Sequence, residues 1–249
     1  MCLILVGWQV HPAYPLVVAA NRDEFHARPT ASAAFWEEDA RVFGGRDLEA
    51  GGTWLGATRD GRFAAVTNVR EPGAVKGKRS RGELTARFLL DQQAAQTYAE
   101  ALTPGDYSGF NLLLADRETL VYASNRDPGY RSLPPGVYGL SNHRLDTPWP
   151  KLLKARENFS RALDRLPDEA AFFELLADRS IETDDRLPDT GVPLAWERLL
   201  SAVFVQSPDY GTRASTLLLR NAAGDMVLYE KSFAADGSET QSSRISTAV

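Results

Sequence analysis

The chain contains a single cysteine, and this residue stands at position 2, directly after the initiator methionine. Cysteine is small enough that a methionine before it is normally removed, so Cys2 is expected to become the first residue of the mature chain. Its free α-amine would titrate at about pH 7.7–8.0, several units below a lysine. A neutral amine two carbons from the sulfur can accept the thiol proton, so one residue would supply both nucleophile and base.

A second group of polar residues follows an apolar run in the segment VVAANRDEF, residues 17–25. Asp23 could orient the α-ammonium group of Cys2. Arg22 could lower the pKa of the thiol and hold an anionic part of a substrate. Amide donors for an oxyanion are also needed, and Asn68 and Asn142 both stand where a predicted strand ends.

Each of these residues also has a simpler interpretation. A lone cysteine in a buried strand is usually an inert small hydrophobe. Arg22 and Asp23 could form a structural ion pair, and Asn68 and Asn142 taken singly could cap loops. The catalytic interpretation therefore depends on whether these side chains converge at one place.

The predicted elements bring Cys2 and the polar cluster together. Residues 2–10 and 16–20 are nearly continuous apolar runs, typical of buried strands, and the intervening HPAYP segment predicts a hairpin turn because prolines cannot occupy a central strand. A turn centred near Ala13 puts Cys2 opposite Glu24 and Ile4 opposite Arg22. Directly opposed Cβ atoms in an antiparallel pair lie about 5 Å apart.

The remaining pattern mixes strands and helices. Helices are expected over residues 80–102, 148–166, 168–178 and 194–203. Strands are expected over 53–58, 62–68, 110–115, 120–124, 137–140, 214–220 and 226–233, with the glycine-rich stretch 43–68 alternating turns and short strands. Strands at both ends of the chain with helices between them predict an α+β or layered fold in one domain, residues 1–233. Residues 234–249 are polar and predict a flexible tail.

Composition excludes several classes of function. A net charge of −5 and a pI near 5.3 argue against nucleic-acid binding, and the short basic run KGKRSR, residues 76–81, is interpreted as a solvated loop. The three histidines have no partners at metal-ligand spacing, so neither a metal nor a cofactor is expected. The paired glycines lack a phosphate-loop pattern, and a Ser-His-Asp triad stays open although no GxSxG segment marks one.

The same features predict a location. A single cysteine gives no internal disulfide, the N-terminal apolar stretch has no preceding positive charge, and no apolar run is long enough to span a bilayer. These observations predict a cytoplasmic protein without a membrane span.

The sequence resembles the NRDE family, which includes the transport and Golgi organisation protein 2 homologues. The resemblance rests on MCLI at the start, ANRDE after the hairpin, GGRDLEAGGTWLG, VTNVRE, and GLSN followed by DTPWPK, and it extends from residue 1 to about 232. It implies a four-layer α-β-β-α sandwich of N-terminal-nucleophile hydrolase type. The family is similar to acylases that cleave non-peptide amides with an N-terminal cysteine.

By this resemblance the catalytic candidates are Cys2, Arg22, Asp23, Asn142 and Arg213, with Asn68 as a rival for the oxyanion role. Asn21, Glu24, Trp54 and His143 are the candidate substrate-binding residues. One departure matters: the acylases read Arg-Asn-x-Asp, whereas here the arginine and aspartate are adjacent. Adjacent strand residues face opposite sides, so one of the two is expected to miss the thiol.

The sequence thus predicts a thiol amidohydrolase acting on a small non-peptide amide or acyl compound. The alternative implied by the resemblance is a non-enzymatic protein that binds and carries haem, an acyl-CoA or a lipid on the same scaffold. In that case Trp8, Trp54, His26 and His143 would be candidates for contact with the apolar ligand. A protein-binding adaptor is a third possibility, with no specific support.

Overall fold

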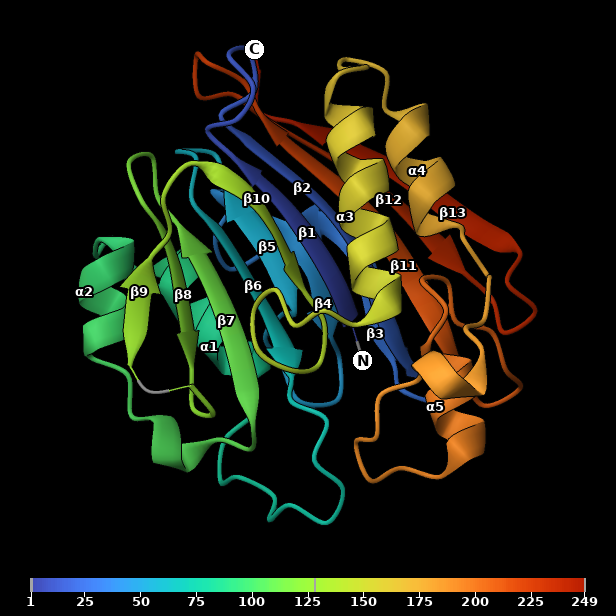
Figure 1. The fold of residues 1–249 in the computed structure, drawn as a ribbon. Helices are drawn as coiled ribbons and strands as arrows, with labels where there is room; N and C mark the ends of the chain where they lie inside the picture. The colour runs from blue at the N-terminus through green and yellow to red at the C-terminus, as the bar shows by residue number, and fades with distance from the viewer. Residues whose placement is uncertain (1, 128, 249) are drawn as a thin grey trace.

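The computed structural model describes residues 2–127 and 129–248, and these form two β-sheets packed face to face with helices outside them (Figure 1). The six-stranded sheet has the order β10-β1-β2-β11-β12-β13 and the seven-stranded sheet runs from β3 to β9 in chain order. The strands are β1 (Cys2–Trp8), β2 (Leu16–Phe25), β3 (Thr30–Phe35), β4 (Val42–Asp47), β5 (Leu55–Thr58), β6 (Phe63–Asn68), β7 (Phe110–Ala115), β8 (Leu120–Ser124), β9 (Tyr130–Ser132), β10 (Gly136–Leu140), β11 (Tyr210–Arg220), β12 (Met226–Phe233) and β13 (Glu239–Ser246).

The helices form the two outer layers. They are α1 (Gly82–Leu90), α2 (Ala95–Glu100), α3 (Pro150–Leu163), α4 (Ala170–Leu176) and α5 (Leu194–Leu200). Helices α1 and α2 pack on the seven-stranded sheet, and α3 and α4 pack on the six-stranded sheet. The chain therefore has the α-β-β-α layers that the resemblance implies.

Successive side chains of β1 and β2 point to opposite faces of the six-stranded sheet, and each face packs against a different layer. Ile4, Val6 and Val18 belong to the apolar core between the sheets, whereas Leu3 and Val17 belong to the core under α3 and α4. Both faces of these strands are buried, and this accounts for their nearly continuous apolar sequence. The same alternation directs Cys2 toward the space between the two sheets.

The structure corrects two predicted elements. The single helix expected over residues 80–102 is two helices, because the Asp91 carboxylate accepts hydrogen bonds from the backbone N–H groups of Gln92 (2.6 Å) and Gln93 (3.1 Å) and ends α1 there. The flexible tail expected at 234–249 contains β13, which pairs along β12 and extends the six-stranded sheet. Polar side chains are compatible with this strand because it lies at the edge of the sheet.

The pairing of β13 predicts a measurable loss of stability when its one buried apolar side chain is cut back. Ile245 is 8% exposed and belongs to the core between the sheets. We expect Ile245→Ala to lower the free energy of unfolding by about 2–4 kcal/mol, measured by urea denaturation. Ile181→Ala is the matched control, since Ile181 is 59% exposed. Equal and negligible effects of both changes would mean that residues 239–246 are not held in the sheet.

Candidate functional site

A cavity of about 430 Å³ opens beside Cys2, and most of the predicted catalytic residues line it. Its wall is built by the first residue of β1, the end of β2, the end of β6 and the segment that precedes α1. The sulfur-bearing residue is only 8% exposed, so the thiol meets solvent through this cavity and is otherwise covered. The predicted site residues that line it are Cys2, Arg22, Asp23, Glu24, Trp54 and Asn68.

The register of the first hairpin differs from the prediction by two residues. Cys2 pairs with Arg22, and Trp8 pairs with Leu16. The turn is therefore centred one residue before Ala13, and the backbone N–H of Gln9 donates to the carbonyl of Pro15 (2.8 Å) to close it. Because the shift is an even number of residues, each side chain keeps its predicted face. The correction moves Arg22 directly opposite the nucleophile candidate.

Arg22 and Asp23 both line the cavity although they are neighbours in one strand. The pairing of β11 with β2 shifts register between Thr212 and Ala214, opposite these two residues, so Arg213 has no partner in the ladder. Such a bulge bends the strand that carries it, here β11. Arg22 and Asp23 reach one cavity, and the expectation that one of the two misses the thiol itself stays a prediction.

Neighbouring strand residues fix the position of Asp23. The Oγ1 of Thr212 donates to its Oδ1 (2.7 Å), and the Tyr210 hydroxyl donates to its backbone carbonyl (3.0 Å). Burial raises the pKa of the Asp23 carboxyl, and the nearby Lys151 ammonium acts in the opposite direction. Asp23 is thus a rigidly held carboxyl whose charge depends on the cations around it.

Lys151 is part of this electrostatic setting, and sequence reasoning missed it. It lies near the start of α3, is buried, and donates to the backbone carbonyl of Leu200 (2.7 Å). Burial lowers the pKa of Lys151 to about 8, while attraction to Asp23 opposes the decrease. The DTPWPK motif contains this lysine, but a lysine after two prolines carries no sequence signal that it is buried.

The two predicted oxyanion asparagines form a pair. The Asn142 side-chain amide donates to the Asn68 Oδ1 (2.8 Å) and to the Asn68 backbone carbonyl (3.2 Å). Asn142 is fully buried, whereas Asn68 lines the cavity. With its oxygen engaged by Asn142, Asn68 has its Nδ2 amide group left to donate hydrogen bonds to a ligand. Of the two asparagines, only Asn68 lines the cavity, and Asn142 contacts it from the buried side.

Besides the buried Asn142, three predicted site residues do not line the cavity. Asn21 is buried on the opposite face of β2, where its Nδ2 donates to the carbonyls of Leu176 (2.8 Å) and Val203 (2.9 Å). His143 is exposed and its Nδ1 is bonded to the Thr147 hydroxyl (3.0 Å). The Arg213 Nη1 donates to the carbonyls of residues 25, 26 and 28, and this side chain lines a separate cavity of about 200 Å³.

The aromatic residues proposed for an apolar ligand are also dispersed. Trp8 is 1% exposed in the core between the sheets, and the His26 Nε2 is bonded to the carbonyl of Ser207 (3.2 Å). Trp54 lines the Cys2 cavity without the other three. These four candidates therefore do not line one cavity.

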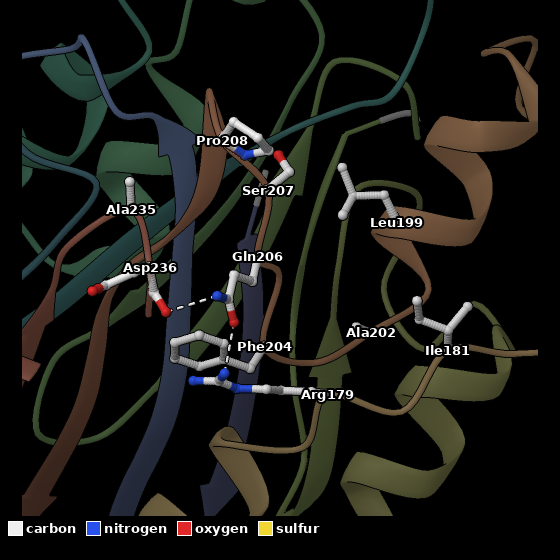
Figure 2. Close-up of a pocket in the computed structure, with 10 residues that line it drawn as sticks. All are labelled: Arg179, Ile181, Leu199, Ala202, Phe204, Gln206, Ser207, Pro208, Ala235 and Asp236. Atoms are coloured by element: carbon white, nitrogen blue, oxygen red, sulfur yellow. Dashed lines mark hydrogen bonds between the residues drawn. The ribbon is translucent and has the colours of Figure 1, made fainter. Parts of the chain in front are cut away.

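Cavity volume alone would not have singled out the cavity at Cys2 as the functional site. A larger cavity, of about 560 Å³, lies beside α5, whose Leu199 lines it, and is shown in Figure 2. There Arg179 packs over the Phe204 ring at 4.5 Å and donates to the Gln206 Oε1 (2.6 Å). None of the predicted site residues lines this cavity, so the chemistry directs attention to the smaller one at Cys2.

The surroundings of Cys2 disfavour the thiolate form. Burial raises the pKa of the Cys2 thiol, the Asp23 and Glu24 carboxylates raise it further, and Arg22 opposes them. Arg22 does lower the pKa of the thiol, as the sequence predicted, but loss of solvation outweighs this one cation. A reaction at this sulfur needs a base in the cavity.

With this geometry established, comparison with known proteins identifies the lineage. The family model described as Transport and Golgi organisation 2 matches residues 1–235. The chain belongs to this family. Transport and Golgi organization protein 2 homologues from Bos taurus and Homo sapiens are 38% and 37% identical to it, over 93% of each chain. The Drosophila melanogaster protein of that name is 28% identical, over 93% of this chain and 92% of its own.

Solved structures show the same fold at low sequence identity. A mutant of conjugated bile acid hydrolase from Clostridium perfringens aligns with a TM-score of 0.53 and 10% identity, over 98% of this chain and 92% of the other. The Caenorhabditis elegans orthologue of N-acylethanolamine-hydrolyzing acid amidase aligns with a TM-score of 0.51 and 14% identity, over 88% and 92%. The prediction of an α+β sandwich of N-terminal-nucleophile hydrolase type is confirmed.

The buried thiol predicts slow alkylation at neutral pH. Iodoacetamide reacts with the thiolate, so its rate should rise through a midpoint above about pH 8.5, the value for an unperturbed cysteine. Because the chain has one cysteine, intact-mass spectrometry reports this reaction without interference. A rate that is already maximal below pH 8 would contradict the assignment.

Lys151 predicts a particular pH dependence of stability. Its folded pKa of about 8 lies below the unfolded value of 10.5, so between these values the unfolded chain binds more protons and stability rises with pH. Relative to Lys151→Met, the wild-type protein should gain up to about 3 kcal/mol in unfolding free energy from pH 8 to pH 10.5. Urea denaturation across this range measures the difference, and parallel pH profiles would show that Lys151 titrates normally.

Proposed function

We propose that this protein is an N-terminal-cysteine amidohydrolase acting on a small non-peptide amide or related acyl compound. The observation that supports the proposal most is the convergence of Cys2, Arg22, Asp23 and Asn68 on one solvent-connected cavity. The family relationship alone does not specify a reaction. The solved relatives of this fold carry names of enzymes that hydrolyse N-acyl amides, which makes this reaction class a reasonable starting point.

The proposed reaction begins with removal of Met1, which lies outside the described residues. The Cys2 sulfur attacks the substrate carbonyl carbon, and the thiol proton passes to the α-amine of the same residue. The raised thiol pKa makes this internal base necessary. Asp23, fixed by Thr212, is suited to hold the resulting ammonium in place.

The negative charge that develops on the carbonyl oxygen needs a donor, and Asn68 Nδ2 is the proposed one, with Asn142 as its positioning residue. The C–N bond then breaks as the ammonium returns its proton to the leaving amine. The acyl group remains on sulfur as a thioester. Water, deprotonated by the α-amine, attacks this thioester and releases the acid, which restores the thiol.

The proposal predicts which side chains control turnover. Amides of fatty acids with 7-amino-4-methylcoumarin serve as probes, and coumarin release reports hydrolysis. Cys2→Ala should abolish release, and Asn68→Ala should lower kcat by about 10²- to 10³-fold. His143→Gln is the matched control and should leave kcat unchanged, because His143 is exposed and away from the cavity. Hydrolysis that survives Cys2→Ala would overturn the proposal.

A further inference from the structure

The basic run KGKRSR, residues 76–81, is a loop in which Lys76 and Lys78 are exposed, as expected from the sequence. Each of its six residues lines the cavity at Cys2. This segment precedes α1 and faces the thiol across the hollow between the sheets. The loop is therefore both solvated and part of the cavity wall, and the proposed reaction does not account for its charge.

The backbone of this segment is fixed against residues 106–109. The Gly77 N–H donates to the Ser108 hydroxyl (2.8 Å), and the Arg79 N–H donates to the carbonyl of Asp106 (3.1 Å). A Cβ at Gly77 would lie 2.3 Å from the Ser108 backbone nitrogen, so only glycine permits this approach. The charged side chains are thereby presented from a defined wall of the cavity.

Positive charge is in excess on this wall. Arg79 is paired with Glu83, but within residues 2–127 and 129–248 no carboxylate lies at ion-pairing distance from Lys76, Lys78 or Arg81. Arg81 donates instead to the carbonyl of Gly109 (3.2 Å). A chain with a net charge of −5 has thus placed unneutralised cations beside its candidate nucleophile.

The acidic residues of the cavity do not offset this charge. Asp47 and Glu49 are bound by Arg28 at 2.8 Å and 3.2 Å. Glu24 lies 3.8 Å from Arg22, beyond hydrogen-bonding range. The Nη1 of Arg22 is buried and has no hydrogen-bond acceptor among the described residues. Lys76, Lys78 and Arg81 thus add positive charge that the carboxylates of the cavity, which lie nearer Arg22 and Arg28, do not pair with, and an anionic ligand would balance this charge.

We infer that the substrate carries an anionic group, a carboxylate, sulfonate or phosphate, that lies against Lys76, Lys78 and Arg81 while its carbonyl carbon lies at Cys2. This inference builds on the proposed function and specifies its substrate class. Lys76 and Lys78 are exposed and act as specificity-determining residues through long-range attraction. Such attraction weakens at high ionic strength.

Binding to the Cys2→Ala protein tests this inference independently of catalysis. Four probes are titrated by calorimetry. N-decanoylglycine carries a carboxylate on the amine side of the amide, and N-decanoylethanolamine is its neutral partner. N-decylsuccinamic acid carries a carboxylate on the acyl side, and N-decyl-4-hydroxybutanamide is its neutral partner. At least one anionic probe should bind about tenfold more tightly than its neutral partner, and the difference should shrink in 0.5 M NaCl. N-decanoyltaurine and N-decanoyl-O-phosphoethanolamine then distinguish sulfonate and phosphate from carboxylate.

Substitution of Lys76 and Lys78 tests whether residues 76–81 bind the anionic group. Lys76→Gln/Lys78→Gln should weaken binding of the preferred anionic probe by about three- to tenfold and leave its neutral partner unaffected. The matched control is Lys154→Gln/Lys231→Gln, which removes the same charge from α3 and β12 and should change neither affinity. Melting temperatures confirm that both variants are folded.

The outcomes separate the two proposals. If both anionic probes bind no better than their neutral partners, or if the two double variants behave alike, the anionic substrate class is refuted even when the thiol proves catalytic. If anionic probes bind as expected but no acyl compound is hydrolysed, the binding inference stands and the hydrolase proposal fails.

Discussion

The antiparallel pairing of β1 with β2 is the constraint on which the candidate site depends. This ladder places Cys2 opposite Arg22, and strand alternation turns both toward the space between the sheets. The pairing of β2 with β11 adds Thr212, whose hydroxyl holds Asp23. Because both faces of β1 and β2 are packed, a one-residue slip would bury polar groups in either apolar core, so the register is strongly determined. The buried pairing of β1 with β2 thereby fixes the position of Cys2.

Burial has an electrostatic consequence that shapes any chemistry here. Loss of solvation raises the pKa of both Cys2 and Asp23 and lowers the pKa of Lys151, so each group is shifted toward its neutral form. The Arg22 cation lowers the pKa of the thiol, but burial raises it by more. Charge has to be created during the reaction and stabilised by groups already in place, and this is the setting in which an internal amine base and a fixed amide donor are most effective.

Much of the layered fold could be predicted from the sequence, because apolar runs bounded by proline or glycine report strands directly. Residues 2–20 were enough to predict the hairpin and the burial of both of its faces. Its register was displaced because a five-residue loop with two prolines does not specify where the turn is centred. β13 was missed because an edge strand needs little apolar sequence, and the break after Leu90 depends on a local carboxylate that helix periodicity ignores.

The site was predictable only where its residues are near in sequence. Cys2, Arg22 and Asp23 came from one hairpin, whereas Thr212 reaches Asp23 from 189 positions away. Arg22 and Asp23 line one cavity although they are neighbours in β2, and strand alternation does not predict this. Asn21 looked equivalent to its neighbours, yet its carboxamide satisfies two backbone carbonyls on the helical side. The basic run was interpreted only as a solvated loop because it is short, and the sequence does not show that its backbone is held against residues 106–109.

The central claim is that Cys2 acts as a nucleophile whose base is its own α-amine. It is tested most directly by acid-quenching protein mixed with decanoyl aminomethylcoumarin amide and measuring the mass of the N-terminal peptide. The comparison is between protein that has lost Met1 and protein purified with Met1 retained. The account predicts a decanoyl thioester on Cys2 that forms and decays in the processed protein and is absent from the unprocessed one. An adduct that forms equally in both, or hydrolysis without any adduct on Cys2, would contradict it.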